Sequence, residues 1–163
     1  MHERLYKISR EKKPGSDEKT SVYAIQHEIF FKILQKDKSI LAHFVYRMGQ
    51  VLDAIQHVNF IHSDLKPDNI LLRMNQSTQK LEEIKLIDFG SSFKFDEKME
   101  FSATTPEYLS PEMILYLDTL KNKPDQVAAA AKNLKNLSKP WSFDVWSFGV
   151  ILVEIITGYP VWM

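Results

Sequence analysis

The chain has 163 residues with 21 basic and 21 acidic side chains, so its formal net charge is zero. This length suits one domain, and a hydrophobic share of 44% is ordinary for a globular protein. A neutral balance gives no indication of nucleic acid or of an anionic membrane surface as a partner. The absence of cysteine excludes disulfides and thiolate metal sites. We expect a cytoplasmic location, with the nucleus as the alternative.

No membrane segment is expected. The first 13 residues are charged and are not followed by an apolar core, which argues against a signal peptide. Residues 148–163 are the most apolar run, but the run is short and contains Glu154. A buried helix explains it better than a membrane span.

The first elements are predicted to be helical. Residues 10–20 are polar and contain a Pro-Gly pair, which favours a loop. Apolar residues then recur at helical spacing over residues 22–34. A longer amphipathic helix is predicted over residues 40–58, with Asp37 or Ser39 as its N-cap.

A small β element is predicted to follow. Asn59 suits a left-handed exit from the long helix. Residues 70–74 and 84–87 are predicted strands, joined by a polar hairpin-like loop. Residues 90–111 lack periodicity and are predicted to be extended, before a short helix at residues 112–116.

The C-terminal part is predicted to be helical. Residues 117–140 are polar at both ends and rich in alanine at the centre, which predicts a helical insert at the surface. Residues 141–156 form a strongly apolar helix pattern, which Gly158 and the proline after Tyr159 end.

Residues 61–72, IHSDLKPDNILL, carry three polar groups on one short loop. The carboxylate of Asp64 can accept a proton, and the ammonium of Lys66 can neutralise a phosphate. The amide oxygen of Asn69 can bind a hard cation such as Mg²⁺. For this motif alone, a capped loop with solvated charges is the alternative.

Residues 84–92, IKLIDFGSS, place Asp88 at a strand end, followed by Phe89 and Gly90. A carboxylate there is well placed to bind a metal ion. An ordinary turn after an edge strand is the better explanation of these three residues alone. A hairpin between the two motifs would bring Asn69 and Asp88 together.

In combination, the two motifs resemble those of the protein kinase family, whose catalytic loop reads H-R-D-L-x-x-x-N and whose metal loop reads D-F-G. Two further strings follow in the family's order. Residues 105–112, TPEYLSPE, resemble the substrate-docking loop and the A-P-E motif, and residues 144–152, DVWSFGVIL, resemble the central helix of the large lobe. Four ordered matches make chance a poor explanation.

The resemblance implies roles for single residues. Asp64 resembles the carboxylate that orients and deprotonates the substrate hydroxyl, and Lys66 resembles the residue that steadies the transferred phosphate. Asn69 and Asp88 resemble the two Mg²⁺ ligands. Thr105 resembles the threonine that joins the substrate loop to Asp64 and Lys66.

Further positions match the nucleotide site and the interior. Leu71 and Lys66 resemble nucleotide-binding residues, with Leu71 beneath the adenine. His62 and Phe89 resemble members of a packed stack, and Asp144 resembles the helix residue that anchors the catalytic loop. The implied cofactors are ATP and Mg²⁺, and the implied partners are proteins with Ser or Thr hydroxyls.

The family's small lobe is expected to be missing. Its Gly-rich loop needs clustered glycines, and no two of the five glycines lie close together. The string VYAIQ is not accepted as the V-A-I-K strand of that lobe, because Gln26 stands in place of the lysine and the string lies too near Asp64 in sequence. A helix also explains the spacing of its apolar residues better than a strand does. We therefore expect a kinase-like α+β fold, here a mainly helical large lobe with a small β-hairpin. Residues 1–20 would form a variable segment near the hinge, and residues 21–163 a partial kinase domain with its insert at 117–140.

Two departures from the family's pattern concern regulation and ion pairing. Ser63 replaces the catalytic-loop arginine that receives the activation-loop phosphate, so phosphorylation of Ser91, Ser92 or Ser102 is predicted not to switch the protein through that contact. Glu112 matches the A-P-E glutamate, and no arginine occurs after it to pair with it.

The residues favour a serine/threonine kinase that transfers the γ-phosphoryl of ATP to proteins. A catalytically inactive lobe that binds or competes for partners is the alternative, and a small-molecule kinase fits less well. Lys66 and the Thr105 loop follow the serine/threonine pattern. The strings IDFGSS and TGYP resemble the dual-specificity, tyrosine-regulated branch, whereas TPEYLSPE resembles the cyclic-nucleotide-dependent branch, so the subfamily stays open.

Overall fold

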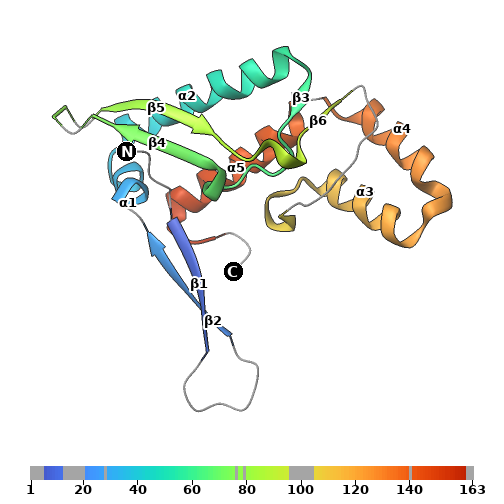
Figure 1. Cartoon of the computed structure of the whole chain (residues 1–163), viewed down its shortest axis with the longest axis horizontal. Helices are drawn as coiled ribbons and strands as arrows, with labels where there is room; N and C mark the ends of the chain where they lie inside the picture. The colour runs from blue at the N-terminus through green and yellow to red at the C-terminus, as the bar shows by residue number, and fades with distance from the viewer. Residues whose placement is uncertain are drawn as a thin grey trace.

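The protein is described here by a computed structural model, which covers residues 6–12, 21–27, 29–75, 77–78, 80–95, 105–139 and 141–160 (Figure 1). Its helices are α1 (Ile29–Lys36), α2 (Lys38–His57), α3 (Pro111–Asn122), α4 (Val127–Leu137) and α5 (Ser142–Thr157). Its strands are β1 (Tyr6–Lys12), β2 (Ser21–His27), β3 (Phe60–Ile61), β4 (Ile70–Met74), β5 (Leu81–Leu86) and β6 (Phe93–Lys94). Short 3-10 turns occur at Pro67–Asn69, Phe89–Ser91, Pro106–Tyr108 and Pro124–Gln126.

The strands of the described residues form three antiparallel pairs, β1–β2, β3–β6 and β4–β5. The β4–β5 hairpin pairs Ile70 with Leu86 at one end and Met74 with Leu81 at the other, with a register shift between Arg73 and Met74. Each of these sheets has only two strands, and a two-stranded sheet is marginally stable by itself. Helices therefore supply most of the packing.

Helix α2 begins and ends as the sequence predicts. The side chain of Asp37 accepts hydrogen bonds from the backbone N–H groups of Ser39 and Ile40, at 2.9 and 3.1 Å. These bonds satisfy two N–H groups that have no partner within the helix. After α2, Asn59 adopts a φ of 56°, the left-handed conformation that asparagine tolerates.

The prediction for the N-terminal region was partly wrong. Residues 21–27, predicted to begin a helix, form β2, and the helix begins only at Ile29. Arg10, Glu11 and Lys12, predicted to lie in a loop, belong to β1, while residues 13–20 lie outside the described part. A short segment rich in Val, Ile and Tyr can fit the spacing of a helix and also form a strand. Here pairing with β1 over seven positions makes the segment a strand.

Two boundaries and one strand also differ from the predictions. Strand β5 begins at Leu81 rather than Ile84, and α3 runs on to Asn122 rather than ending at Tyr116. The segment predicted to be extended contains β6, which pairs with β3. A two-residue pairing between distant segments leaves no local pattern in the sequence, and residues 96–104 lie outside the described part.

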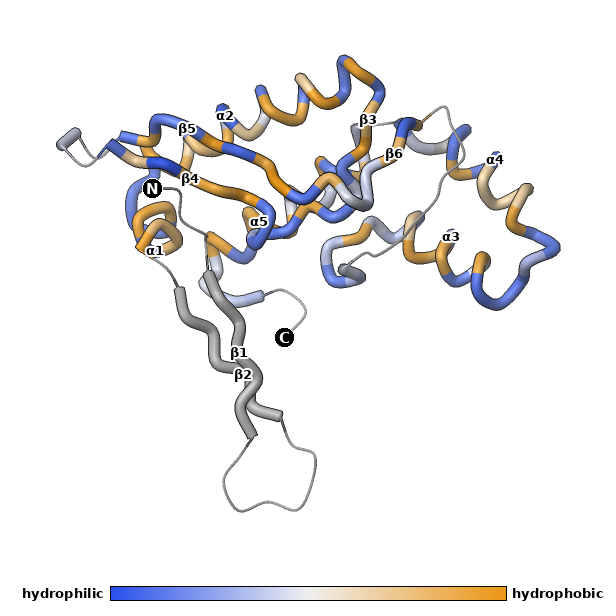
Figure 2. The backbone as a smooth tube through the Cα atoms, viewed as in Figure 1, coloured by the Kyte–Doolittle hydropathy of each residue, from blue (hydrophilic) through white to orange (hydrophobic). Residues whose placement is uncertain are grey.

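The main core lies between α1, α2, the β4–β5 hairpin and α5. Figure 2 shows hydrophobic stretches of β4 and α5 in the middle of the view, with the partly hydrophobic α2 above them. Burial of this apolar surface is the main favourable contribution to the fold. The most deeply buried side chains of this core are Phe31, Leu34, Phe44, Met48, Leu65, Ile70, Leu72, Ile151 and Ile155.

A second core joins α3 and α4 to the first turn of α5. It contains Ile61, Phe93, Leu109, Met113, Tyr116, Leu134 and Phe143. The alanine-rich segment predicted to be a surface helix is α4, whose Ala130 and Ala131 pack against this core. Helix α5 ends where predicted, because Gly158 adopts a φ of 82°. Among the described residues, no helix has the length and apolar character needed to cross a membrane.

Candidate active site

The catalytic-loop motif connects β3 to β4, and a side chain of helix α5 is hydrogen-bonded to its backbone. Asp144 is buried, and its two carboxylate oxygens accept hydrogen bonds from the backbone N–H groups of His62 and Ser63, at 2.8 and 3.1 Å. Burial raises the pKa of Asp144 above its usual value, although the two N–H groups and the nearby His62 lower it. The predicted anchoring contact is therefore present.

Asp64, Lys66 and Thr105 meet at one point. Lys66 Nζ donates to Asp64 Oδ2 at 2.7 Å and to Thr105 Oγ1 at 2.9 Å. Thr105 donates to Asp64 Oδ1 twice, from its hydroxyl at 2.7 Å and from its backbone N–H at 3.1 Å. The three predicted residues thus form one closed set of charge-assisted hydrogen bonds, the stronger kind.

Asn69 completes this set from the turn Pro67–Asn69. Its Nδ2 donates to the backbone oxygen of Asp64 at 2.8 Å and lies 3.3 Å from Asp64 Oδ2. Asn69 and Asp64 are both buried, so these bonds are little weakened by competing water. Because the amide nitrogen faces Asp64, the amide oxygen of Asn69 remains available for a cation.

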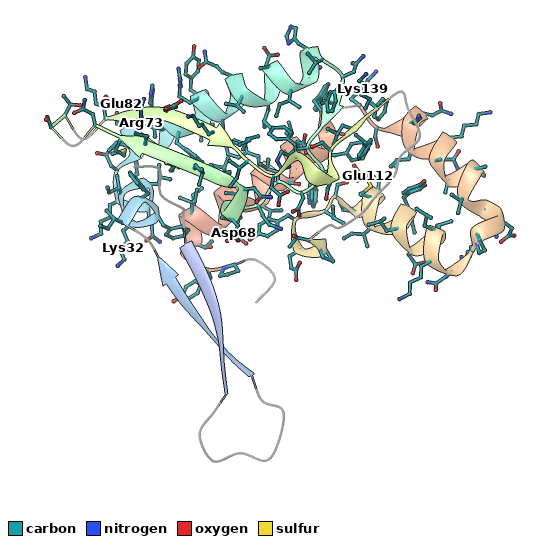
Figure 3. The ribbon with its side chains drawn as sticks, viewed as in Figure 1. Lys32, Asp68, Arg73, Glu82, Glu112 and Lys139 are labelled. Carbon is teal, nitrogen blue, oxygen red and sulfur yellow. The ribbon has the colours of Figure 1, made fainter. Side chains whose placement is uncertain are left out.

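The β4–β5 hairpin brings Asp88 to the same end of the sheet as Asn69. Its register pairs Ile70 with Leu86, and the backbone N–H of Ile87 donates to Asn69 O at 3.0 Å. Figure 3 shows Asp68, next to Asn69, at one end of the hairpin and Arg73 and Glu82 at the other. The hairpin thus brings the loops that carry Asn69 and Asp88 together, as the sequence predicted.

Asp88 itself is exposed and adopts a φ of 64°, which is uncommon for a residue with a side chain. It precedes the 3-10 turn Phe89–Ser91, which Ser92 closes by donating from its N–H to Phe89 O at 3.1 Å. The left-handed backbone redirects the chain out of β5 and leaves the carboxylate accessible. Such strain is often found at functional sites.

His62 and Phe89 are in contact, as the resemblance implied. Their ring centroids are 4.8 Å apart with an interplanar angle of 60°. His62 is fully buried, and its Nε2 lies 3.0 Å from the backbone oxygen of Ile87. This pair of contacts joins the catalytic loop to the metal loop.

Leu71 is half-buried on β4, between the fully buried Ile70 and Leu72. Since side chains alternate across a strand, Leu71 faces away from the helical core that holds its two neighbours. An apolar side chain on that face suits the floor of an adenine site. Its role in nucleotide binding stays a prediction.

The structure also gives a place to residues whose roles the sequence did not reveal. The Tyr108 hydroxyl donates to Glu154 Oε2 at 3.1 Å, and the Ser147 hydroxyl donates to Tyr108 O at 2.8 Å. Both acceptors and donors are buried, so α5 anchors the turn that follows Thr105. The only sequence signal was the presence of Ser147 and Glu154 within an otherwise apolar helix.

The donors present fit a Mg²⁺–nucleotide group. Mg²⁺ prefers oxygen ligands and is commonly held by one or two protein side chains together with substrate phosphates. The amide oxygen of Asn69 and the exposed carboxylate of Asp88 supply such ligands at one end of the hairpin. Within the described residues, no group of three or more His, Asp or Glu side chains is arranged as an independent metal site.

Glu112 lies half-buried in the first turn of α3 (Figure 3). A carboxylate is favoured there because the N-terminal end of a helix carries partial positive charge. Its position beside Leu115, Tyr116 and Leu134 of the α3–α4 pair keeps it partly solvated. A partly solvated carboxylate of this kind avoids the free-energy cost of a fully buried, unpaired charge.

Comparison with known proteins agrees with this geometry. The family model described as "Protein kinase domain" matches residues 18–163. The chain belongs to the protein kinase family. The fold agrees, because the described residues form a mainly helical kinase domain with few strands, and no β-rich lobe occurs among them.

Individual relatives support the same assignment. The chain is 36% identical over 122 residues to the serine/threonine-protein kinase ppk5 of Schizosaccharomyces pombe, covering 75% of this chain and 12% of that protein. It is 34% identical over 123 residues to dual specificity tyrosine-phosphorylation-regulated kinase 2 of Drosophila melanogaster, covering 76% and 14%. It is 31% identical over 137 residues to dual specificity tyrosine-phosphorylation-regulated kinase 3 of Homo sapiens, covering 80% of this chain and 19% of that protein. The chain therefore spans less than a fifth of the length of these relatives.

Proposed function

We propose that this chain is the large-lobe part of a serine/threonine protein kinase that transfers the γ-phosphoryl group of ATP to Ser or Thr hydroxyls of proteins. The observation that carries the proposal is the hydrogen-bonded set of Asp64, Lys66, Thr105 and Asn69. Such a set supplies positioning and electrostatic stabilisation, which are the main requirements of phosphoryl transfer.

Asp64 is the proposed acceptor of the substrate proton. Its Oδ1 is occupied by Thr105, whereas its Oδ2 is shared between Lys66 at 2.7 Å and the weaker contact with Asn69 at 3.3 Å. A substrate hydroxyl can replace the Asn69 contact at low cost, because Asn69 keeps its shorter bond to the backbone oxygen of Asp64. The hydroxyl would then lie within hydrogen-bond reach of the carboxylate.

Lys66 is the proposed stabiliser of the transferred phosphate, because its ammonium is held at the same point and is partly exposed. Asn69 and Asp88 would hold Mg²⁺. Bound there, Mg²⁺ would neutralise charge on the phosphates of ATP. Leu71 would contact the adenine from the face of β4 that points away from the helical core.

The branch and the substrates are also proposals. The strings IDFGSS and TGYP, together with relatives named as dual-specificity tyrosine-phosphorylation-regulated kinases, support that branch over the cyclic-nucleotide-dependent one. We also propose a cytoplasmic or nuclear location, with which the absence of cysteine is compatible. A separate small lobe that completes the nucleotide site is a further expected partner.

A partner-binding lobe without catalysis is the second candidate, favoured by the absence of clustered glycines in this sequence. Calorimetry of ATP binding in the presence of Mg²⁺ separates the two. We expect binding by the chain, loss of binding in Asp88→Ala, and no change in Asp125→Ala, which removes an exposed carboxylate from the α3–α4 connection. Absence of binding in all three proteins would support the second candidate.

For a chain that binds, phosphate transfer to a Ser/Thr peptide is measured next. Asp64→Asn keeps the size of the side chain but removes its capacity to accept a proton at neutral pH. We expect ATP binding to persist and transfer to fall at least a hundredfold. Equal loss of binding and transfer would contradict the role given to Asp64.

A further inference from the structure

Ser63 is buried, with only 6% of its surface exposed, and it adopts a φ of 62°. This left-handed conformation is uncommon for serine and needs support from its surroundings. One support is Asp144, which accepts the backbone N–H of Ser63 at 3.1 Å. The second support involves the side chain.

The Ser63 hydroxyl donates to the backbone oxygen of Ser91 at 2.5 Å. Ser91 is also buried and is the last residue of the 3-10 turn that follows Asp88. Next to it, the Ser92 hydroxyl donates to the backbone oxygen of His62 at 3.3 Å. Two hydrogen bonds therefore run in opposite directions between the catalytic loop and the metal loop.

Little empty space lies beside Ser63. The cavity that Ser63 lines with Ser110 and Asp144 has a volume of about 10 Å³, roughly the space of one water molecule. Ser63 is therefore a buried, hydrogen-bonded residue and not a position left open to solvent.

Asp88 depends on this contact through the chain. Its left-handed backbone leads directly into the turn Phe89–Ser91, and the C-terminal end of that turn is held by Ser63. Fixing Ser91 restricts the orientations that Asp88 can adopt at the other end. We call the hydrogen bond from the Ser63 hydroxyl to Ser91 O the clasp; it joins two neutral groups and involves no phosphate.

We propose that Ser63 is a positioning residue whose hydroxyl clasps the metal loop to the catalytic loop and so fixes Asp88 for Mg²⁺ without phosphorylation. The metal-binding part of this inference rests on the proposed function. The clasp itself does not, because it can be measured in the protein without nucleotide.

Hydrogen exchange of the segment 84–95 is the test, compared among the wild-type chain, Ser63→Gly and Ser63→Ala. Both variants remove the hydroxyl, but glycine tolerates the positive φ and alanine does not. Ser110→Ala is the matched control, since Ser110 is equally buried and its hydroxyl has no hydrogen-bond partner in the described structure. The Mg²⁺ concentration that gives half-maximal ATP binding is measured in the same proteins.

We expect exchange in this segment to rise about fivefold to thirtyfold in both Ser63 variants and to stay unchanged in Ser110→Ala. The half-maximal Mg²⁺ concentration should rise by a similar factor in both variants. A rise in exchange in Ser63→Ala alone would assign the effect to backbone strain and overturn the clasp. Unchanged exchange in both variants would also overturn the clasp, whether or not the chain binds ATP. A wild-type chain that binds no ATP would overturn the proposed function instead, and the exchange result would still decide the clasp.

Discussion

Replacing Thr105 by valine tests how the substrate loop contributes to the active site. Valine has nearly the same shape but lacks the hydroxyl, which donates to Asp64 Oδ1 at 2.7 Å and accepts from Lys66 Nζ at 2.9 Å. The backbone N–H of residue 105 can still donate to Asp64. The change therefore removes two side-chain contacts and leaves the loop attached.

The expected magnitude follows from these contacts. A hydrogen bond to a charged group contributes about 1.5–3 kcal/mol. The site is partly exposed, and the direct bond between Lys66 and Asp64 survives, so we expect a combined loss of about 2 kcal/mol. That corresponds to a decrease of about thirtyfold in kcat/KM.

The assay is peptide phosphorylation at varied peptide and ATP concentrations, with Thr105→Ser as the control that retains the hydroxyl. We expect Thr105→Ser to lie within about threefold of the wild type and the KM for ATP to change little in either variant. Activity of Thr105→Val within twofold of the wild type would refute the reasoning. So would an equal loss in both variants, because the hydroxyl would then be irrelevant.

Two further predictions concern stability. Gly158→Ala should lower the free energy of unfolding by about 1–2 kcal/mol, because residue 158, directly after α5, has a φ of 82°. Gly149→Ala, within α5, should be neutral or stabilising, since a Cβ there meets open space; denaturant unfolding of both variants checks this, and equal effects would contradict it. Asp144→Asn should lower stability by about 1–3 kcal/mol, because an amide can accept from only one of the two N–H groups of His62 and Ser63. Burial raises the folded-state pKa of Asp144 above 3.8, so the stability that this group contributes is present below 3.8 and is lost as pH rises through the raised value. The difference from the Asn variant should therefore shrink as pH rises from 3.8, and an identical pH dependence in both proteins would argue against the raised pKa.

The sequence predicted best the elements that carry several independent signals. Helix α2 combines a long apolar stripe with a capping aspartate before it and an asparagine after it, and α5 ends at a glycine. Strand β4 was predicted with the observed bounds because a run of five residues lies between polar loop residues. Agreement among such signals is what makes a local prediction dependable.

The elements that were mispredicted depend on partners distant in sequence. The apolar residues of β2 fit a helical period, and only the pairing with β1 makes the segment a strand. Strands β3 and β6 have two residues each and exist because Phe60 and Ile61 pair with Lys94 and Phe93. No local pattern encodes such pairings, because they are stabilised by contacts formed only in the folded chain.

The candidate site was predictable as a set of residues but not as a set of contacts. The motifs named Asp64, Lys66, Asn69 and Thr105, and the structure shows that they are hydrogen-bonded to one another. The contact between Ser63 and Ser91 was not predicted. The sequence showed only that an arginine was missing from the motif, which gave no reason to expect a new hydrogen bond.

The buried polar side chains of helix α5 support the loops of the active site. Asp144, Ser147 and Glu154 lie along one side of the helix at a spacing close to whole turns, and burying each costs free energy unless it is paired. Each is paired with a loop of the active site: Asp144 with the catalytic loop, and Ser147 and Glu154 with Tyr108. Glu154, which in the sequence only argued against a membrane span, thus belongs to the same support as Asp144. The polar interruptions of this helix therefore identify the side of the core on which the two loops are assembled.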